Sequence, residues 1–249
     1  MKKLKIVGTY DGMACGAIAF IESGYEIERY VAFEIDKYAV KTSSHNFPFI
    51  EHKGDVFEAD FTEYEGFDWV IGGSPCTHWS IAQKINRETE ASGLGWELFQ
   101  QYVRAVKEVK PKYFLYENNK SMSNAIRESI SSTFGFEPIC INSALVSAQN
   151  RQRLYWCGIR QEDGTYKKAY IPQPEDRGIL LKDILEGGAE SVSLKHLTER
   201  EMDYMIRDHQ DQRWSFCVKP QEKEKSPCIT ANIHKGVPYN VCAERVKDE

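Results

Sequence analysis

The chain has 249 residues, which suits one large domain or one domain with a smaller appendage. A hydrophobic fraction of 41% excludes a disordered chain, and no apolar run approaches the ~20 residues of a membrane span. The formal charge of −5 argues against nucleic-acid binding over the whole surface but leaves room for a local basic cleft.

Cysteine usage indicates a reducing compartment. Seven scattered cysteines, an odd number with no Cys-x-x-Cys pair, favour neither a disulfide framework nor a zinc site. The N-terminal sequence enters a strand-like run at once, which predicts no signal peptide. We therefore expect a cytoplasmic protein without a bound metal.

The first 160 residues alternate between strand and helix patterns. A small-residue helix is predicted over 13–24, and Leu98, Tyr102, Ala105 and Val109 form one stripe of a second helix. The predicted strands are 4–10, 27–36, 69–73, 114–118 and 154–160. This alternation predicts an α/β fold with a parallel, doubly wound sheet, which binds ligands beyond the carboxyl ends of its strands. Residues 161–249 are punctuated by Pro172, Pro174 and Gly178, with short strand-like runs and few helix patterns, and predict a small, loop-rich second module.

The first three predicted strands lead into residues that suit a nucleotide-like cofactor. Gly8, Gly12 and Gly16 surround the first strand–helix turn and would let the backbone approach a ligand. Glu34 follows the second strand at a spacing suited to ribose hydroxyls, and Asp55 could accept from an adenine amino group. The glycines do not form G-x-G-x-x-G, and tight turns with surface acids explain these residues equally well.

The stretch VIGGSPCTHWS (70–80) places Cys76 just beyond a buried strand and directly behind Pro75. A cysteine thiolate there would be a strong nucleophile at the crevice, although a free cysteine is also commonly an inert buried hydrophobe. The other six cysteines are assigned no role.

Two further groups would face the same edge of the sheet. Glu117 ends the apolar strand in FLYEN and would either serve chemistry or reach solvent. Gln149, Arg151 and Arg153 alternate along the approach to the last strand, so we expect them on one face, where they suit phosphate or a polar ring edge. The alternative for the arginines is a role as ordinary surface charges.

Taken in order, these elements resemble the cytosine carbon-5 DNA methyltransferases, both the de novo animal type and phage and bacterial relatives. The matching elements are D-G-x-x-x-G at 11–16, Glu34, Asp55, Ser-Pro-Cys, Glu-Asn and Gln-x-Arg-x-Arg. The resemblance covers about residues 4–160 and implies a Rossmann-like domain that uses S-adenosylmethionine. The cofactor-binding residues it implies are Tyr10, Asp11, Gly12, Gly16, Glu34, Ile35, Asp55, Val56, Gly73, Pro75 and Leu98.

The resemblance also implies a mechanism on duplex DNA with a flipped cytosine. Cys76 would add to carbon 6 of the base and so activate carbon 5 toward the methyl donor. Glu117 would contact N3 and the exocyclic amine and supply a proton, and Asn118 would position the cysteine loop. Arg153, with Arg151 behind it, would hold the cytosine O2. Such enzymes act in DNA methylation and restriction-modification, which predicts a bacterial or phage-infected cell.

Three departures from the family pattern stand out. Asn119 replaces the usual valine after Glu-Asn, and Thr77-His78-Trp79 replaces Gln-x-Phe after the cysteine. Stretches 180–188 and 226–236 resemble the variable target-recognition region, so 161–249 is predicted to be a partial module of that kind. No late Gly-Asn segment follows, which predicts a truncated chain, a second polypeptide that completes it, or weak binding of the cofactor.

Two other functions stay open. One is a non-catalytic or partner-dependent DNA-binding subunit, and the other is an RNA cytosine methyltransferase. A nicotinamide-dependent dehydrogenase is disfavoured because it would explain neither Cys76 nor the paired arginines.

Overall fold

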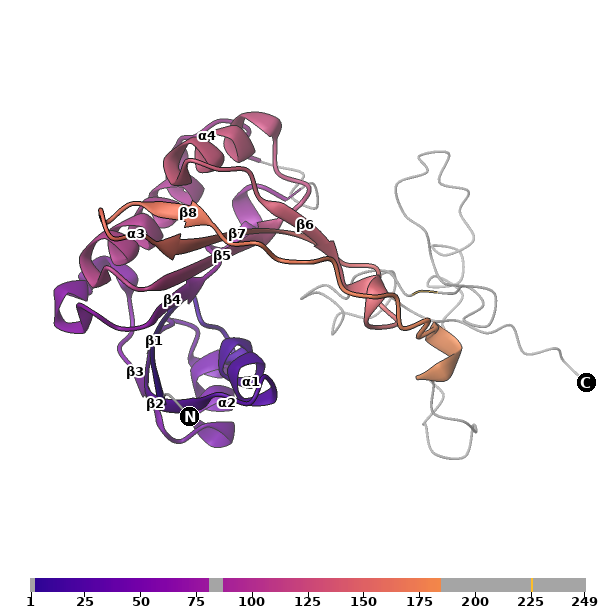
Figure 1. The fold of residues 1–249 in the computed structure, drawn as a ribbon, viewed down its shortest axis with the longest axis horizontal. Helices are drawn as coiled ribbons and strands as arrows, with labels where there is room; N and C mark the ends of the chain where they lie inside the picture. Colours follow the sequence, from indigo (N-terminus) through magenta and orange to yellow (C-terminus); the bar gives the residue numbers. More distant parts are fainter. Residues whose placement is uncertain (1–2, 81–86, 185–224, 226–249) are drawn as a thin grey trace, which may run out of the picture. The chain divides into compact units, whose positions relative to one another are not determined.

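The computed structural model describes residues 3–80, 87–184 and 225. Within these residues an eight-stranded sheet has the order β3-β2-β1-β4-β5-β7-β6, and β8 pairs with β7 (Figure 1). The strands are β1 (Lys3–Thr9), β2 (Glu26–Phe33), β3 (Ile50–His52), β4 (Trp69–Gly72), β5 (Tyr113–Asn119), β6 (Ile139–Asn142), β7 (Gln152–Arg160) and β8 (Tyr166–Lys168). The helices are α1 (Cys15–Glu22), α2 (Lys37–Asn46), α3 (Gly93–Val109) and α4 (Asn124–Phe134). This architecture confirms the predicted Rossmann-like α/β fold.

The two faces of the sheet bury different clusters because side chains alternate along each strand. In β1, Leu4 and Ile6 join a cluster that includes Ala17 of α1, whereas Val7 joins a larger cluster with α3 and α4. The predicted stripe of α3 is confirmed on its inner side, where Tyr102 is fully buried. The strands are therefore covered on both faces, and their carboxyl ends are left to carry loops.

The sheet is mixed rather than parallel throughout. β1 pairs in parallel with β2 and β4, and β4 with β5, as predicted. β7 runs antiparallel to β5, with Arg153 opposite Asn119, so the parallel prediction is wrong for this strand. Residues 143–151 between β6 and β7 contain only a short 3-10 turn, and a parallel return would need a crossover segment, usually a helix.

Contacts divide the chain into two units. The first unit comprises Met1–Cys140 and Arg153–Ile171, and the second comprises Ile141–Gln152 and Pro172–Glu249. This division differs from the predicted boundary at residue 160, because the chain turns back after β7 and pairs Tyr166 of β8 with Arg160. Most of the predicted target-recognition module, including 226–236, lies outside the described residues.

The described part of the second unit has one well-defined anchor. Lys225 Nζ donates hydrogen bonds to the carbonyl oxygens of Ala144, Ser147 and Ile179. No helix in the described ranges is both long and apolar enough to pass through a membrane.

Candidate active site

Cys76 lies on the loop that follows β4, at the carboxyl edge of the parallel strands. It begins a short 3-10 turn, Cys76–His78, and its carbonyl oxygen accepts from Trp79 N at 3.1 Å and Ser80 N at 2.9 Å. Its side chain is half-buried and is not in a disulfide. Burial raises the pKa of Cys157 to about 12, so that cysteine stays an inert thiol. Cys76 thus lies half-buried at the rim of the sheet, a position open to a nucleophilic role.

Gly73 brings the start of this loop against Glu117. A Cβ at Gly73 would lie 2.6 Å from the Glu117 carbonyl oxygen and 3.0 Å from Glu117 Oε2. No side chain fits there without displacing backbone. The glycine therefore allows the cysteine loop and the end of β5 to meet.

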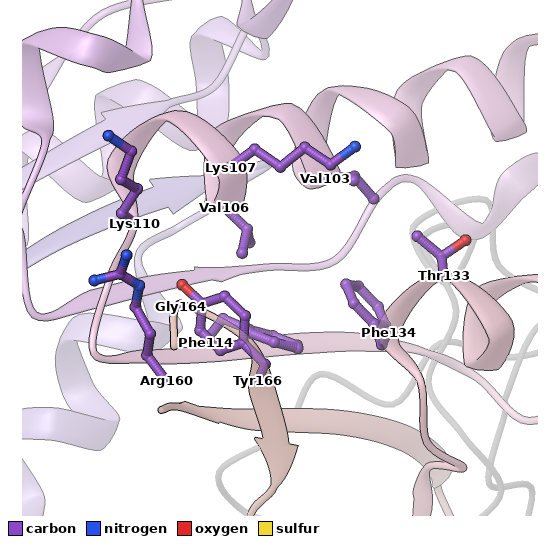
Figure 2. Close-up of a pocket in the computed structure, with 10 residues that line it drawn as sticks. All are labelled: Val103, Val106, Lys107, Lys110, Phe114, Thr133, Phe134, Arg160, Gly164 and Tyr166. Atoms are coloured by element: carbon purple, nitrogen blue, oxygen red, sulfur yellow. The ribbon is translucent and has the colours of Figure 1, made fainter. Parts of the chain in front are cut away.

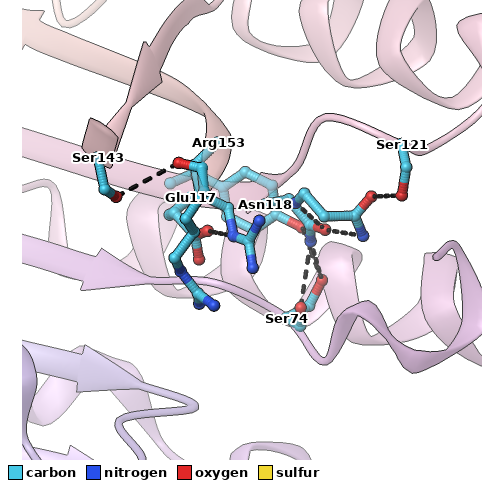
Figure 3. A network of polar contacts seen from close by, with 9 residues as sticks. Ser74, Glu117, Asn118, Ser121, Ser143 and Arg153 are labelled. Carbon is cyan, nitrogen blue, oxygen red and sulfur yellow. Dashed lines mark hydrogen bonds and ion pairs between the residues drawn. The ribbon is translucent and has the colours of Figure 1, made fainter. Parts of the chain in front are cut away.

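Asn118 fixes the same loop from the other side (Figure 3). Its Nδ2 donates to the Ser74 carbonyl oxygen and to the Tyr116 hydroxyl, both at 3.1 Å. The Ser74 and Tyr116 hydroxyls are 2.6 Å apart. Burial raises the pKa of Tyr116 well above its ordinary value, so the phenol remains neutral. This buried network holds Ser74, two residues before Cys76.

Glu117 and Arg153 form an ion pair on one face of the sheet, as Figure 3 shows. Arg153 Nε lies 2.9 Å from Glu117 Oε1, and the side chains are only 16% and 33% exposed. Arg153 is directly opposite Asn119, so Glu117, two residues earlier, is its diagonal neighbour. The pairing of β5 with β7 therefore brings these two predicted residues together.

Of the predicted set Gln149, Arg151 and Arg153, one residue lies in the last strand. β7 begins at Gln152, so of these three residues only Arg153 belongs to the strand. Arg151 lies in the second unit, where its backbone N donates to Asn142 Oδ1 at 3.0 Å.

At the cofactor end, Glu34 joins two loops. Its Oε2 accepts from Gly12 N, and its Oε1 accepts from Ile35 N and Asp36 N, all at 2.8 Å. Ile35 beside it is 74% exposed, an apolar side chain at the rim. The carboxylate is thus fixed between the loops after β1 and β2.

The loop after β1 is strained and partly buried. Tyr10 has a left-handed backbone (φ 54°), and its hydroxyl donates to the Leu98 carbonyl oxygen at 2.7 Å. Asp11 Oδ1 accepts from the Tyr30 hydroxyl at 2.5 Å. Burial raises the pKa of Asp11 to about 6, although the bond from Tyr30 opposes this shift. Gly16 has a packing role, because a Cβ there would lie 2.3 Å from Ile71 Cδ1.

Asp55 caps the 3-10 turn Val56–Glu58, and its Oδ1 accepts from Phe57 N at 3.0 Å. Arg104 of α3 donates to the Val56 carbonyl oxygen at 2.6 Å and to the Ala59 carbonyl oxygen at 2.8 Å. The Val56 side chain is only 3% exposed and lies in the core, and its role in cofactor binding stays a prediction. Asp55 stays in the loop as the N-cap of the turn, whereas the next side chain, Val56, points into the core.

The unpaired buried polar atoms at this edge suit a polar ligand. Thr9 Oγ1, Asp11 Oδ2 and both ring nitrogens of His52 are buried without a hydrogen-bond partner. Thr9 and His52 end β1 and β3, and Asp11 follows β1. Buried polar atoms are normally paired. Together with the exposed Ile35, these groups fit a nucleoside-like cofactor.

Several residues that hold the candidate site in place could not be identified from the sequence. Tyr30, Tyr116 and Arg104 sit inside ordinary strand or helix patterns, and only the fold shows what they hold. Ser74 belongs to the Ser-Pro-Cys stretch, but the sequence pattern assigns a role only to Pro75 and Cys76. Among the described residues, no group of three or more His, Cys, Asp or Glu could hold a metal ion.

A separate hollow lies away from these residues (Figure 2). It has a volume of about 400 Å³ and is lined by the start of β5 at Phe114, the end of β7 at Arg160, and Lys110 after α3. These positions mark the opposite edge of the sheet. The hollow therefore takes no part in the candidate site.

Comparison with known proteins identifies a family and several relatives. The sequence profile of the C-5 cytosine-specific DNA methylases matches residues 4–241, well beyond the 4–160 that the motifs cover. The chain is 35% identical over 177 residues to the orphan methyltransferase M.SPRI of Bacillus phage SPR, covering 65% of this chain and 39% of that protein. It is 30% identical over 172 residues to the type II methyltransferase M.FnuDI of Fusobacterium nucleatum, covering 64% and 48%.

The chain spans less than half the length of these relatives. The family profile nevertheless covers nearly all of the sequence. This chain therefore belongs to the C-5 cytosine-specific DNA methylase family.

Proposed function

We propose that this chain methylates carbon 5 of cytosine in DNA, with S-adenosylmethionine as the methyl donor. The observation that carries the proposal is the convergence on Cys76. Asn118 holds the loop at Ser74, Gly73 places the loop against Glu117, and Arg153 pairs with that carboxylate. A nucleophile and an acid–base group thus belong to one rigid framework.

In the proposed reaction the Cys76 thiolate adds to carbon 6 of a flipped cytosine. Glu117 contacts N3 and the exocyclic amine and supplies a proton as charge develops on the ring. Arg153 orients Glu117 and contacts the O2 side of the base. Bound S-adenosylmethionine supplies the electrophilic methyl group. Loss of the carbon-5 proton then lets the thiolate leave and restores the aromatic ring.

The cofactor residues have proposed roles as well. Glu34 accepts hydrogen bonds from ribose hydroxyls, and the exposed side chain of Ile35 packs on the adenine ring. Asp55 accepts from the adenine amino group. Tyr10, Asp11, Gly12 and Leu98 shape the floor of the pocket, and Gly73 and Pro75 border it beside Cys76. Of the unpaired buried atoms described above, Asp11 Oδ2 belongs to this set, and Thr9 and His52 lie beside it at the same edge of the sheet.

A covalent-trapping experiment tests the proposal. Fluorine replaces the carbon-5 proton whose loss would release the thiolate, and it cannot leave as a cation. Duplex DNA with 5-fluorocytosine and S-adenosylmethionine should therefore give an adduct that survives denaturing electrophoresis. Cys76→Ser should give none, whereas Cys15→Ser, which changes an exposed cysteine, should behave as wild type. Absence of any adduct with a folded wild-type chain would refute the proposal.

The same assay also tests the RNA alternative and the need for a second polypeptide. The RNA alternative predicts an adduct on 5-fluorocytosine transfer RNA but none on duplex DNA. If a second polypeptide is needed to complete the enzyme, the adduct should form only after a cell extract is added. The cytoplasmic location in a bacterial or phage-infected cell stays a prediction.

A further inference from the structure

We propose that Arg87 and Glu88 are positioning residues that hold the far end of the Cys76 loop. The inference rests on the proposed function, since it concerns the orientation of the proposed nucleophile. Ser74 is already fixed by Asn118, two residues before Cys76. Arg87 and Glu88 fix His78 and Trp79, just after it.

Glu88 joins the loop to the beginning of α3. Its Oε2 accepts from Trp79 Nε1 at 3.1 Å, and its carboxylate accepts from Gly95 N at 3.2 Å. His78 Nδ1 lies 3.5 Å from Glu88 Oε1, and Glu88 N donates to the His78 carbonyl oxygen at 2.9 Å. One carboxylate therefore binds two residues of the cysteine loop and the first turn of the helix.

Arg87 joins the same loop to the segment after β5. Its Nε donates to the Trp79 carbonyl oxygen at 3.1 Å, and its Nη2 donates to the Ser121 carbonyl oxygen at 2.6 Å. The Ser121 hydroxyl donates to Asn119 Oδ1 at 2.7 Å, and Asn119 Nδ2 donates to Asn118 Oδ1 at 3.2 Å (Figure 3). The chain of contacts therefore returns to the residue that holds Ser74.

The contacts of Arg87 and Glu88 with His78 and Trp79, together called the clasp, are tightly packed. Trp79 is fully buried. A Cβ at Gly95 would lie 2.5 Å from Trp79 Nε1 and 2.6 Å from Glu88 Oε2, so the helix approaches the loop as closely as glycine allows. The Glu88 side chain is only 18% exposed. Hydrogen bonds to a charged, partly buried group are stronger than neutral ones.

The chemical value of the clasp is orientation. A thiolate reacts efficiently only when it is held near the attacked carbon in the reactive direction. With the loop fixed on both sides of Cys76, the side chain keeps that direction when the base arrives. Arg87 and Glu88 act through the loop and need no contact with substrate.

The test compares the full-length wild type with Glu88→Gln and Arg87→Lys. Glutamine keeps the volume of Glu88 but places an amide NH₂ where one carboxylate oxygen accepts hydrogen bonds. Lysine keeps the charge of Arg87 but cannot donate to the Trp79 and Ser121 carbonyl oxygens with the planar guanidinium geometry. We expect the rate of adduct formation at saturating DNA and cofactor to fall at least about tenfold. The KM for cofactor should change less than about threefold. Glu90→Gln, the same change at a neighbouring exposed residue, should behave as wild type.

Trp79→Phe gives a second route to the same answer, because it removes the Nε1 donor and keeps an aromatic ring in the core. The double variant with Glu88→Gln should be no slower than the slower single variant, since both changes disrupt the same hydrogen bond between Trp79 Nε1 and Glu88. Wild-type rates in folded Glu88→Gln and Arg87→Lys, or fully additive losses in the double variant, would overturn the inference. No adduct with the wild type would instead refute the proposed function, and the inference with it.

Discussion

The antiparallel register of β5 and β7 places Arg153 diagonally across from Glu117, and the two side chains form an ion pair. Arg153 lies opposite Asn119, and its Nε is 2.9 Å from Glu117 Oε1. Both side chains are partly shielded from solvent, so the pair orients the carboxylate more firmly than an exposed ion pair would.

This pair gives the first prediction. Glu117→Gln should lower the single-turnover rate of methyl transfer by about 10²–10⁴-fold, the range for loss of a general acid–base group. Arg153→Lys should cost less, since a charge remains near the carboxylate. Rates at saturating DNA and cofactor measure both effects. A Glu117→Gln variant within a few-fold of wild type would remove Glu117 from the mechanism.

The contact at Gly73 gives the second prediction. Gly73→Ala forces a methyl group to 2.6 Å from the Glu117 carbonyl oxygen, so the loop must shift and methyl transfer should fall at least about tenfold. Gly66→Ala is the control, because its Cβ meets nothing within 4 Å but its φ of +81° disfavours alanine. It should lose about 1 kcal/mol of unfolding free energy and retain activity. Equal activity loss in both variants would contradict the assignment.

The third prediction concerns pH and Asp11. Its native pKa is raised from 3.8 to about 6, so the native protein binds this proton more tightly than the unfolded chain does. The contribution of Asp11 to stability should therefore fall as pH rises from about 4 to 6, by at most about 3 kcal/mol. Asp11→Asn lacks this titration. The unfolding free energy of wild type minus that of the variant should decline over this window, and a rising difference would refute the burial argument.

The fourth prediction concerns the bridge from Tyr10 to α3. Tyr10→Phe removes the hydrogen bond to the Leu98 carbonyl oxygen and should loosen the cofactor loop. Loss of about 1 kcal/mol corresponds to roughly fivefold weaker binding of S-adenosylmethionine, measurable by titration calorimetry. Tyr25→Phe, at a 52% exposed position, is the matched control and should bind normally.

The sequence predicted most of what positions the site. Strand–helix alternation indicated the parallel part of the sheet, and the residues after β1, β2 and β4 fall at its carboxyl edge as expected. These predictions work because apolar runs and the turns after them are local signals. The placement of Cys76 beyond β4 depends on such signals alone.

The rest depended on contacts between distant segments. The direction of β7 depends on what lies between it and β6, and the residue pattern of β7 itself does not encode this. Arg151 resembles Arg153 in sequence, yet it precedes the strand and belongs to the second unit. Arg87 and Glu88 look like ordinary loop charges until Trp79 and Gly95 are seen around them.

The reversed direction of β7 has a further consequence for protein engineering. Because the strand starts at the carboxyl edge of the parallel strands, its first residues supply the guanidinium, and its register with β5 sets Arg153 opposite Asn119. The length of the connection before the strand is therefore uncoupled from the position of Arg153. Chimeras that exchange this connection between homologues can keep the arginine in register, provided that the pairing of Asn119 with Arg153 is preserved.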